Sequence, residues 1–230
     1  GVKESGVSRE EGGVWLYRLT GDEYRSDGYV YESSGLKFAI QNEAGLIPIN
    51  TSNHYWLKFR LSIKGYSYGE QSSLSAILAD YLDGDDRLRA AGREEPNNSP
   101  GNYLAQECWE LARIEEWRLV LDKHPSFIDF CSLGRRGEIN LNAVPEALWR
   151  TFWPESVDAV VAQRARGVWI GQNNPALSIA PGMISIPPEL YARLGGDSYI
   201  IKVWGQFFST AVRVQLRRST LVSVEQRKID

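Results

Sequence analysis

Sulfur-containing residues and histidine are scarce in this chain of 230 residues, which holds two cysteines, two histidines and one methionine. Cys108 and Cys131 are too few for a disulfide framework, and neither belongs to a CxxC or CxxH pattern, so we expect no zinc site. From the residues alone, the two cysteines either form one disulfide in an oxidising compartment or remain two buried thiols. His54 and His124 lie outside any GxSxG pattern, and the chain has no phosphate-binding loop or dinucleotide fingerprint. The sequence therefore predicts a protein that is not an enzyme.

Long hydrophobic runs and an excess of positive charge are also missing. No run of about eighteen apolar residues occurs, so the sequence contains no candidate membrane-spanning helix. The 26 basic and 29 acidic residues give a net charge of −3, which disfavours a protein built to hold a nucleic-acid backbone. Gly1 is not an initiator methionine and no signal-peptide pattern follows it, so we expect a processed or shortened chain, in which a preceding membrane anchor would not be visible.

The chain does contain β-structure patterns near both ends and helical patterns between them. Alternating, branched and aromatic segments predict strands at residues 14–19, 29–31, 36–40, 199–207 and 211–217. Apolar spacing and capping residues predict helices at about 52–64, 70–82 and 103–121, with two shorter helices that begin near Pro145 and Pro154. The economical architecture is an α+β fold. A β-rich domain with an antiparallel sheet would comprise residues 1–50 and 185–230, and a helical domain at residues 51–184 would be inserted into it.

Two segments of the chain share the pattern G-x-I-x-[I/L]-N. The first runs from Gly45 to Asn50 and the second from Gly137 to Asn142, and two short helices are predicted after each. The match is short enough for chance to produce it. If the repeat is real, we expect the final asparagine of each copy to cap the helix that follows, which is a structural role.

Acidic residues gather at the end of the predicted helix 70–82, in what we call the acidic segment (residues 80–95). Its candidate metal ligands are Asp80, Asp83, Asp85, Asp86 and Glu94. Calcium takes about six to eight oxygen ligands from flexible loops, and Gly84 would let the backbone turn around an ion. The spacing does not match the helix-loop-helix calcium motif. From the residues alone, the acidic segment is either a calcium site or a solvated acidic loop.

The two short helices predicted within residues 138–167 could form a helix-hairpin-helix, a module that often binds DNA backbones. Four arginines lie nearby, Arg135, Arg136, Arg164 and Arg166. Either these arginines bind phosphates or the helices only pack together, and the negative net charge favours the second reading. A nucleic-acid-binding module is the alternative function that the sequence leaves open.

Three motifs occur in an order that is more specific than any of them alone. Residues 40–50 (IQNEAGLIPIN) resemble the pattern I-x-D-x-x-G-x-x-N-L-N, and residues 139–145 (INLNAVP) resemble I-N-L-N-T-A-P. Between them, residues 79–86 (ADYLDGDD) resemble a D-W-x-D-x-D segment that usually continues to G-A-E and a tyrosine, where this chain has Gly92-Arg93-Glu94 and Tyr103. Together they resemble the general secretion pathway protein K family, the large minor pseudopilins of bacterial type II secretion systems.

The similarity extends from about Leu36 to Gly167, and the chain departs from the family pattern at a few positions. Tyr81 replaces the usual tryptophan, Asn42 replaces an aspartate, and Pro48-Ile49 replaces asparagine-leucine. These departures affect the identity of the ligands.

The resemblance implies a pilin-like α/β domain with an antiparallel sheet and a large inserted all-α domain that binds calcium (Ca2+). Carried over by position, Asp83, Asp85 and Glu94 would supply carboxylates to one calcium ion, with Asp80 or Asp86 in support. The ion would hold together a loop whose carboxylates otherwise repel one another.

The resemblance also implies a location and partners. A hydrophobic N-terminal helix, absent from this chain, would anchor the protein in the inner membrane of a Gram-negative bacterium. The soluble part would face the periplasm, where a Cys108–Cys131 disulfide is allowed. The expected partners are two smaller minor pseudopilins in a complex that caps the pseudopilus tip. The major pseudopilin and secreted substrates are further candidates, and no nucleic acid is expected.

Overall fold

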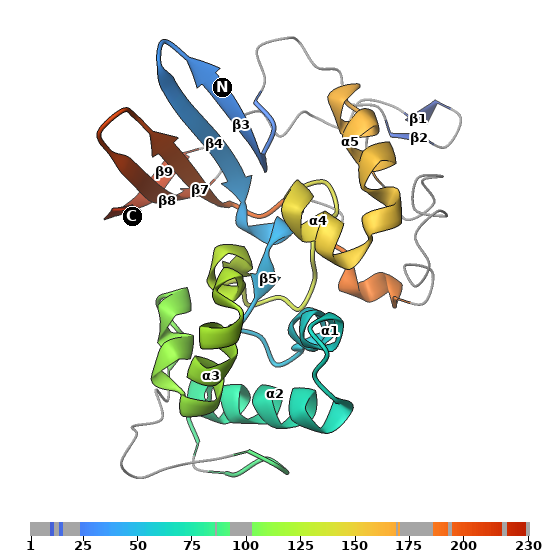
Figure 1. Cartoon of the computed structure of the whole chain (residues 1–230), viewed down its shortest axis with the longest axis vertical. Helices are drawn as coiled ribbons and strands as arrows, with labels where there is room; N and C mark the ends of the chain where they lie inside the picture. Colours follow the sequence, from blue (N-terminus) through green and yellow to red (C-terminus); the bar gives the residue numbers. More distant parts are fainter. Residues whose placement is uncertain are drawn as a thin grey trace. The chain divides into compact units, whose positions relative to one another are not determined.

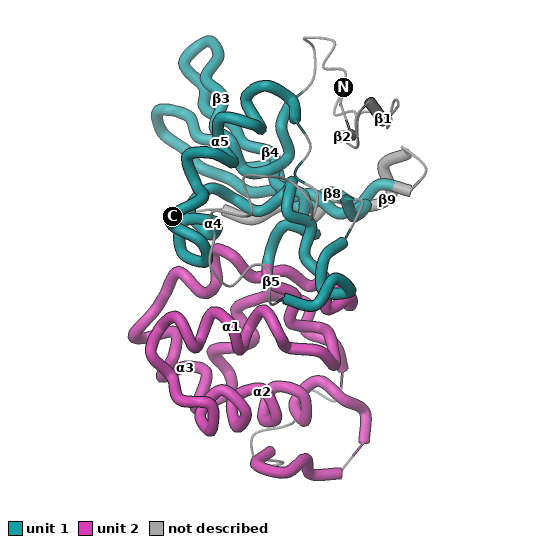
Figure 2. Tube along the Cα trace, turned by 90° about the vertical axis from the view of Figure 1, so that its right-hand side faces the viewer, with its two compact units in different colours: residues 1–46, 138–230 teal, residues 47–137 magenta. Residues whose placement is uncertain are grey.

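The computed structural model describes residues 10–11, 14–15, 24–85, 87–92, 103–168, 170, 186–192, 195–217 and 220–228. The chain divides into two compact units, which are coloured separately in Figure 2. The first unit combines both ends of the chain, Gly1–Leu46 and Glu138–Asp230, and the second is the middle segment Ile47–Gly137. Within the described ranges, every helix is too short or too polar to cross a lipid bilayer.

The first unit is built on a five-stranded antiparallel sheet in the order β3–β4–β7–β8–β9 (Figure 1). Its strands are β3 (Asp27–Ser33), β4 (Leu36–Asn42), β7 (Ser198–Trp204), β8 (Ser209–Arg217) and β9 (Thr220–Lys228). The first four confirm strands predicted from the sequence, and β9 was not predicted. The two ends of the chain meet where β4 pairs with β7, with Ile40 opposite Ile201. This sheet, together with the helices, confirms the predicted α+β class.

The N-terminal residues contribute little else to the described structure. A short antiparallel pair is formed by β1 (Glu10–Glu11) and β2 (Val14–Trp15). The rest of the predicted strand 14–19 lies outside the described residues.

The β3–β4 hairpin is closed by Ser34 and Gly35, whose φ angles of 51° and 78° are those of a tight turn that suits the twist of paired strands.

The helices of the first unit are short, and all of those described except the first one follow the second copy of the repeat. They are η1 (Glu43–Gly45), α4 (Glu146–Phe152), η4 (Pro154–Ser156), α5 (Val157–Ala165) and η6 (Pro188–Leu190). Trp149 and Trp153 are almost completely buried, and the indole Nε1 of Trp149 donates to Ser156 Oγ at 2.9 Å. The two short helices predicted near Pro145 and Pro154 are therefore confirmed, and buried tryptophans hold them in place.

The second unit is mainly helical. Its elements are β5 (Ile47–Pro48), α1 (Tyr55–Ile63), α2 (Tyr68–Leu82), η2 (Cys108–Arg113), α3 (Glu115–Lys123), η3 (Pro125–Phe130) and β6 (Cys131–Ser132). A capping box between Ser67 and Glu70 begins α2, because each side chain accepts a hydrogen bond from the backbone of the other residue. The core includes Trp117, which is fully buried and donates its indole N–H to the Leu74 carbonyl at 3.0 Å.

The predicted helix 103–121 is wrong in part. Residues 103–107 are not helical, η2 covers Cys108–Arg113, and α3 starts only at Glu115 after a break at Ile114. The reason is a long-range contact: the backbone N–H and C=O of Ala105 both bind the side-chain amide of Asn50, so they cannot serve in a helix.

The borders of the compact units also differ from the predicted domain borders. The predicted helical domain 51–184 included α4 and α5, whereas both helices belong to the unit that holds the sheet. Side-chain contacts within that unit explain the difference. Arg164 of α5 binds Asp27 of β3, and Gln41 of β4 donates to the Ala143 carbonyl just before α4.

A disulfide joins Cys108 at the start of η2 to Cys131 in β6, across a sequence separation of 23 residues. The residues alone did not decide between a disulfide and two thiols. The bond ties η2 to the strand that pairs with β5, so it stabilises the second unit from within.

We expect reduction of this disulfide to lower the free energy of unfolding of the second unit by about 3 kcal/mol, because the unfolded chain regains the entropy of a closed loop. Urea unfolding of the full chain, with and without dithiothreitol, measures the change. The Cys108→Ser/Cys131→Ser variant is the control and should not respond to the reductant. An unfolding midpoint of the wild-type protein that is the same with and without reductant would contradict this prediction.

Candidate functional site

The acidic segment begins on the last turns of α2. Asp80 is fully buried, although it carries a carboxylate, and Asp83 forms the C-terminal cap of the helix. The cation that these two carboxylates share is the guanidinium of Arg89. Its Nη1 donates to Asp80 Oδ1 at 2.6 Å and also to Asp83 Oδ2. The carboxylates of Asp80 and Asp83 therefore converge on one positively charged atom.

A tight turn places Arg89 over Asp80. The Gly92 N–H donates to the Arg89 carbonyl at 2.8 Å, and the intervening Ala91 has a φ of 66°. Ser73 Oγ of α2 donates to the Ala91 carbonyl at 3.3 Å, which fixes the turn to the helix. The Arg89 backbone N–H also donates to both oxygens of Asp80, at 3.4 and 3.3 Å. Both carboxylate oxygens of Asp80 therefore accept hydrogen bonds from the turn.

The structure does not bring all of the candidate metal ligands together. Asp80 and Asp83 come together, whereas Asp85 is exposed and its Oδ1 accepts a hydrogen bond from the Arg87 N–H at 3.0 Å. Asp86 and Glu94 lie outside the described residues. In the ranges that are described, no three His, Cys, Asp or Glu side chains form a group able to hold a metal ion.

The chemical type of the available ligand atoms nevertheless suits a hard cation. The oxygens present are carboxylate oxygens, and Asp83 Oδ1 is buried with no hydrogen-bond partner among the described residues. The hydrogen bonds from Asp80 and then Asp83 raise the pKa of Arg89 above its ordinary value, so its charge is secure at any physiological pH. The pair of carboxylates is therefore a cation-holding arrangement, and a divalent ion there would compete with Arg89.

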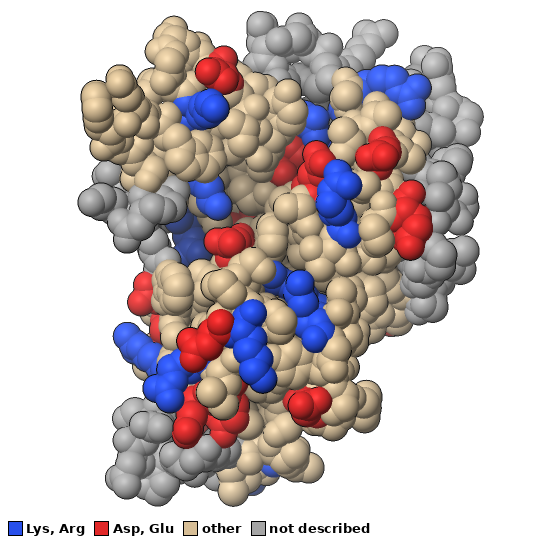
Figure 3. Space-filling view, viewed as in Figure 1, with Lys and Arg blue, Asp and Glu red and all other residues tan. Residues whose placement is uncertain are grey.

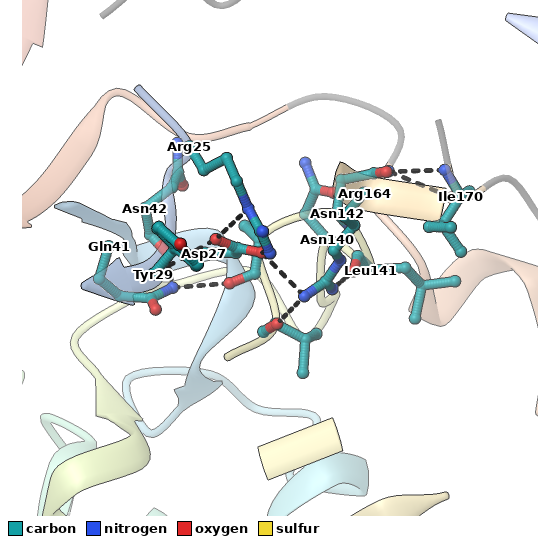
Figure 4. A network of polar contacts seen from close by, with 12 residues as sticks. Arg25, Asp27, Tyr29, Gln41, Asn42, Asn140, Leu141, Asn142, Arg164 and Ile170 are labelled. Atoms are coloured by element: carbon teal, nitrogen blue, oxygen red, sulfur yellow. Dashed lines mark hydrogen bonds and ion pairs between the residues drawn. The ribbon is translucent and has the colours of Figure 1, made fainter. Parts of the chain in front are cut away.

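A second polar cluster lies in the first unit, around the INLN motif (Figure 4). We call it the Arg164 network. The buried guanidinium of Arg164 donates to the carbonyls of Leu141 and Val144 and to Asp27 Oδ2, the last at 3.1 Å. Arg25 binds the same Asp27 oxygen at 2.6 Å. Burial lowers the pKa of Arg164 to about 10, and the charge of Asp27 opposes that shift. Arg164 therefore acts as a structural cross-link between α5, β3 and the motif.

The other arginines considered for nucleic-acid binding are exposed. Arg135, Arg136 and Arg166 face solvent, whereas Arg164 is buried and both of its Nη atoms donate to protein groups. On the face shown in Figure 3, acidic and basic side chains are interspersed, and the coloured residues form no continuous basic surface. These observations give no support to the helix-hairpin-helix alternative.

The prediction that Asn50 and Asn142 cap helices is wrong, because both side chains pair with a distant backbone. Asn142 Oδ1 accepts from the Ile170 N–H at 2.7 Å, and its Nδ2 donates to the Ile170 carbonyl at 3.1 Å. Asn50 does the same with Ala105, at 2.8 Å for both bonds. The side-chain amide offers one donor and one acceptor side by side, as a neighbouring β-strand would. Helices α1 and α4 instead begin after His54 and Pro145, neither of which makes a side-chain cap.

The two copies of the motif share further contacts, so the repeat is a structural one. In the second unit, Ile47 pairs in parallel with Cys131, which directly follows η3. In the first unit, Ile139 pairs in parallel with Tyr191, which directly follows η6. Both of these 3-10 helices begin with a proline. Each unit therefore contains a strand, two helices, a loop bound by asparagine and a returning 3-10 helix.

Sequence reasoning missed the roles of two residues at the end of β4. Asn42 Oδ1 accepts from the Ala44 and Gly196 N–H groups at 2.9 and 3.1 Å, and its Nδ2 donates to the Gly196 carbonyl. Glu43 is buried and accepts two hydrogen bonds from Arg213 of β8, at 3.1 and 2.8 Å. The contact between Asn42 and Ala44 is a local helix cap, whereas Gly196 and Arg213 lie far along the chain, so no local pattern indicates the contacts with them.

His54, one of the two histidines, is also occupied by structure. Its ring nitrogens lie 3.0 Å from Ser75 Oγ and 3.1 Å from the Ile49 carbonyl oxygen. Burial lowers the pKa of His54, so the ring is held neutral. These contacts tie the first copy of the repeat to α2.

We expect Asn50→Asp and Asn142→Asp each to reduce the free energy of unfolding by about 2–3 kcal/mol, because a carboxylate cannot donate to the facing carbonyl and places a charge beside it. Urea unfolding of the full chain measures the loss. Asn53→Asp is the matched control: Asn53 is exposed, and its Oδ1 accepts from the Tyr55 N–H, a task that a carboxylate performs equally well. Equal losses in all three variants would contradict the role assigned to the two asparagines.

The chain was compared with known proteins, and neither a protein-family model nor a curated protein matches it. Among solved structures, a chain of the GspK-GspI-GspJ complex from the enterotoxigenic Escherichia coli type 2 secretion system is similar, with a TM-score of 0.60. The similarity covers 88% of this chain and 84% of that chain at 10% sequence identity. The chain therefore has a GspK-like fold.

Proposed function

We propose that this chain is a structural subunit of a type II secretion pseudopilus, a minor pseudopilin that caps the tip and takes part in protein export across the outer membrane. The observation that carries the proposal is the GspK-like fold, which extends over 88% of the chain. The order of the three sequence motifs supports it. Two of these motifs include the asparagines that pair with distant backbone, and the third supplies the carboxylates that hold Arg89.

The polar residues of the described structure support a structural role and not catalysis. His54, Arg164 and Glu43 are buried, and each is bound to protein groups that join separate elements. A reacting group has to meet a substrate, whereas these side chains meet backbone carbonyls and ion-pair partners. The disulfide suits an oxidising compartment, so we place the soluble part in the periplasm, with a preceding hydrophobic helix as the inner-membrane anchor.

The proposed partners are two smaller minor pseudopilins, by analogy with the complex that contains GspK, GspI and GspJ. Contacts with the major pseudopilin and with secreted substrates belong to the same proposal. The bulk of the inserted helical unit would leave no room for a further subunit above this one, which is how such a protein would cap the filament.

We expect the full chain to form a ternary complex with the soluble domains of the two smaller minor pseudopilins from the same organism. Size-exclusion chromatography with light scattering at about micromolar concentrations measures it, since weaker pairs separate during elution. Mixtures of any two of the three proteins are the controls, because they show which pair associates first. Elution of this chain on its own, from a mixture in which the other two associate, would refute the tip-complex proposal. Salt-dependent binding of duplex DNA in an anisotropy titration would favour the nucleic-acid alternative instead.

We also propose that calcium stabilises the acidic segment. Asp80, Asp83 and Asp85 would contribute ligands from the described residues, and Asp86 and Glu94 would complete the set. The buried Asp83 Oδ1, which has no hydrogen-bond partner among the described residues, supports this proposal. A bound divalent ion would neutralise the repulsion between the carboxylates and hold the segment to the end of α2.

We expect calcium, and not magnesium, to raise the midpoint of thermal unfolding above that in EGTA. Free calcium at about 100-fold above its dissociation constant would add about 2.7 kcal/mol. Asp83→Asn and Asp85→Asn should reduce or remove the rise, whereas Asp122→Asn, at an exposed acidic position on α3, should retain it. Differential scanning calorimetry of the full chain makes the comparison. The same midpoint in EGTA, calcium and magnesium, with no metal in the purified protein, would show that no ion binds.

A further inference from the structure

Arg89 holds the acidic segment to α2 by two kinds of contact. Its guanidinium binds the carboxylates of Asp80 and Asp83, and its backbone N–H binds both oxygens of Asp80. One residue therefore satisfies a carboxylate that has no access to water. The two partners differ in their surroundings, since the side chain of Asp80 is 0% exposed and that of Asp83 is 21% exposed. The contact with Asp80 dominates, because a buried charge depends far more on its partner than an exposed one does.

The turn that carries Arg89 also closes off Asp80. Gly92 lies so near the carboxylate that a Cβ built on it would be 1.7 Å from Asp80 Oδ2. The Gly92 N–H and the Arg89 carbonyl close the turn, and Ser73 fixes it to α2. A metal ion cannot reach the oxygens of Asp80 while Arg89 and Gly92 are in these positions. Binding of an ion by Asp80 therefore requires the turn to move.

We propose that Arg89 is the internal cation of the acidic segment: it closes the segment onto α2 when no ion is bound, and calcium must displace it to bind at Asp80 and Asp83. This inference rests on the calcium site proposed above and adds its regulation. Arg89 binds both oxygens of Asp80 and Oδ2 of Asp83, so an ion that is bound through both side chains displaces it. Residues 87–92 are then held to α2 by Arg89 in one form and by the ion in the other, and Arg89 sets the calcium concentration at which one form replaces the other.

The displacement has a measurable consequence for affinity. A site that is open in only a fraction of the molecules binds its ligand more weakly by that fraction. If Arg89 fills the site in about nine molecules of ten, removing its charge strengthens calcium binding about tenfold. The same change frees the segment in the absence of an ion, because Asp80 then has no cation. Removing the charge of Arg89 is therefore expected to strengthen calcium binding and, without calcium, to weaken the attachment of the segment to α2.

The experiment compares Arg89→Gln, Arg89→Lys and Arg87→Gln in the full chain. Arg87 is the matched control, because it is exposed and, among the described residues, its contact is that of its backbone N–H with Asp85 Oδ1. Isothermal titration calorimetry measures calcium affinity, and hydrogen exchange in EGTA measures the protection of amides in residues 87–92. We expect Arg89→Gln to bind calcium about tenfold more tightly and to lose protection in EGTA, with protection restored by calcium. Arg89→Lys should lie near the wild type, and Arg87→Gln should match it.

The outcomes separate the two proposals. Calcium binding of equal strength in the wild type and in Arg89→Gln would overturn the displacement while leaving the calcium site intact, and so would unchanged protection of residues 87–92 in EGTA. Absence of calcium binding in every variant, Arg89→Gln included, would refute the calcium site itself.

If Arg89→Gln does not fold in EGTA, a second variant tests the role of Arg89 in neutralising Asp80. Asp80→Asn/Arg89→Gln removes both charges, so no buried carboxylate is left without a partner. We expect this double variant to fold in EGTA and to gain nothing from calcium. If it is as unstable as Arg89→Gln alone, the loss does not come from the unpaired charge of Asp80, and the role given to Arg89 is wrong.

Discussion

Pairing of an asparagine amide with a distant backbone is the interaction on which both units depend. Asn50 binds Ala105 and Asn142 binds Ile170, in each case through one donor and one acceptor. A loop that runs against a folded interior must satisfy its backbone N–H and C=O groups, and it has no adjacent strand to do so. The amide supplies that partner from a single side chain. The segment that carries each asparagine, the helices after it and the returning 3-10 helix can then pack together.

Buried charges in this protein follow the same rule, because each is matched to groups that belong to other segments. Arg164 binds carbonyls of the motif loop as well as Asp27. Arg60 of α1 is buried too; it donates to the carbonyls of Ser126 and Phe127, and burial lowers its pKa to about 10. Removing such a partner leaves an unpaired charge in a medium that solvates it poorly. The buried polar groups therefore join loops to helices and to the sheet, which agrees with the structural role that we propose.

Local patterns in the sequence predicted the elements that local chemistry stabilises. The alternation of β8 and the apolar spacing of α2 predicted these two elements, because each pattern lies within the element itself. The helix expected at 103–121 failed for the opposite reason, since Ala105 is held by a residue more than fifty positions earlier. The structure brings the carboxylates of Asp80 and Asp83 together, whereas no pattern in the sequence indicated that Arg89 binds both of them. The calcium ligands stay a prediction.

Contacts between a side chain and the backbone also affect how far the sequence can vary while the fold stays the same. A hydrogen bond to a carbonyl or N–H requires a particular residue on one side only, because every residue but proline offers the same backbone groups. A fold closed by Asn50, Asn142 and Arg164 therefore fixes few positions and leaves the rest free to vary under the demand for apolar packing. This is compatible with a TM-score of 0.60 at 10% identity to the similar chain. In the structural subunit that we propose, the exposed positions would then be available to match different partners, while a few buried amides and guanidinium groups stabilise each unit.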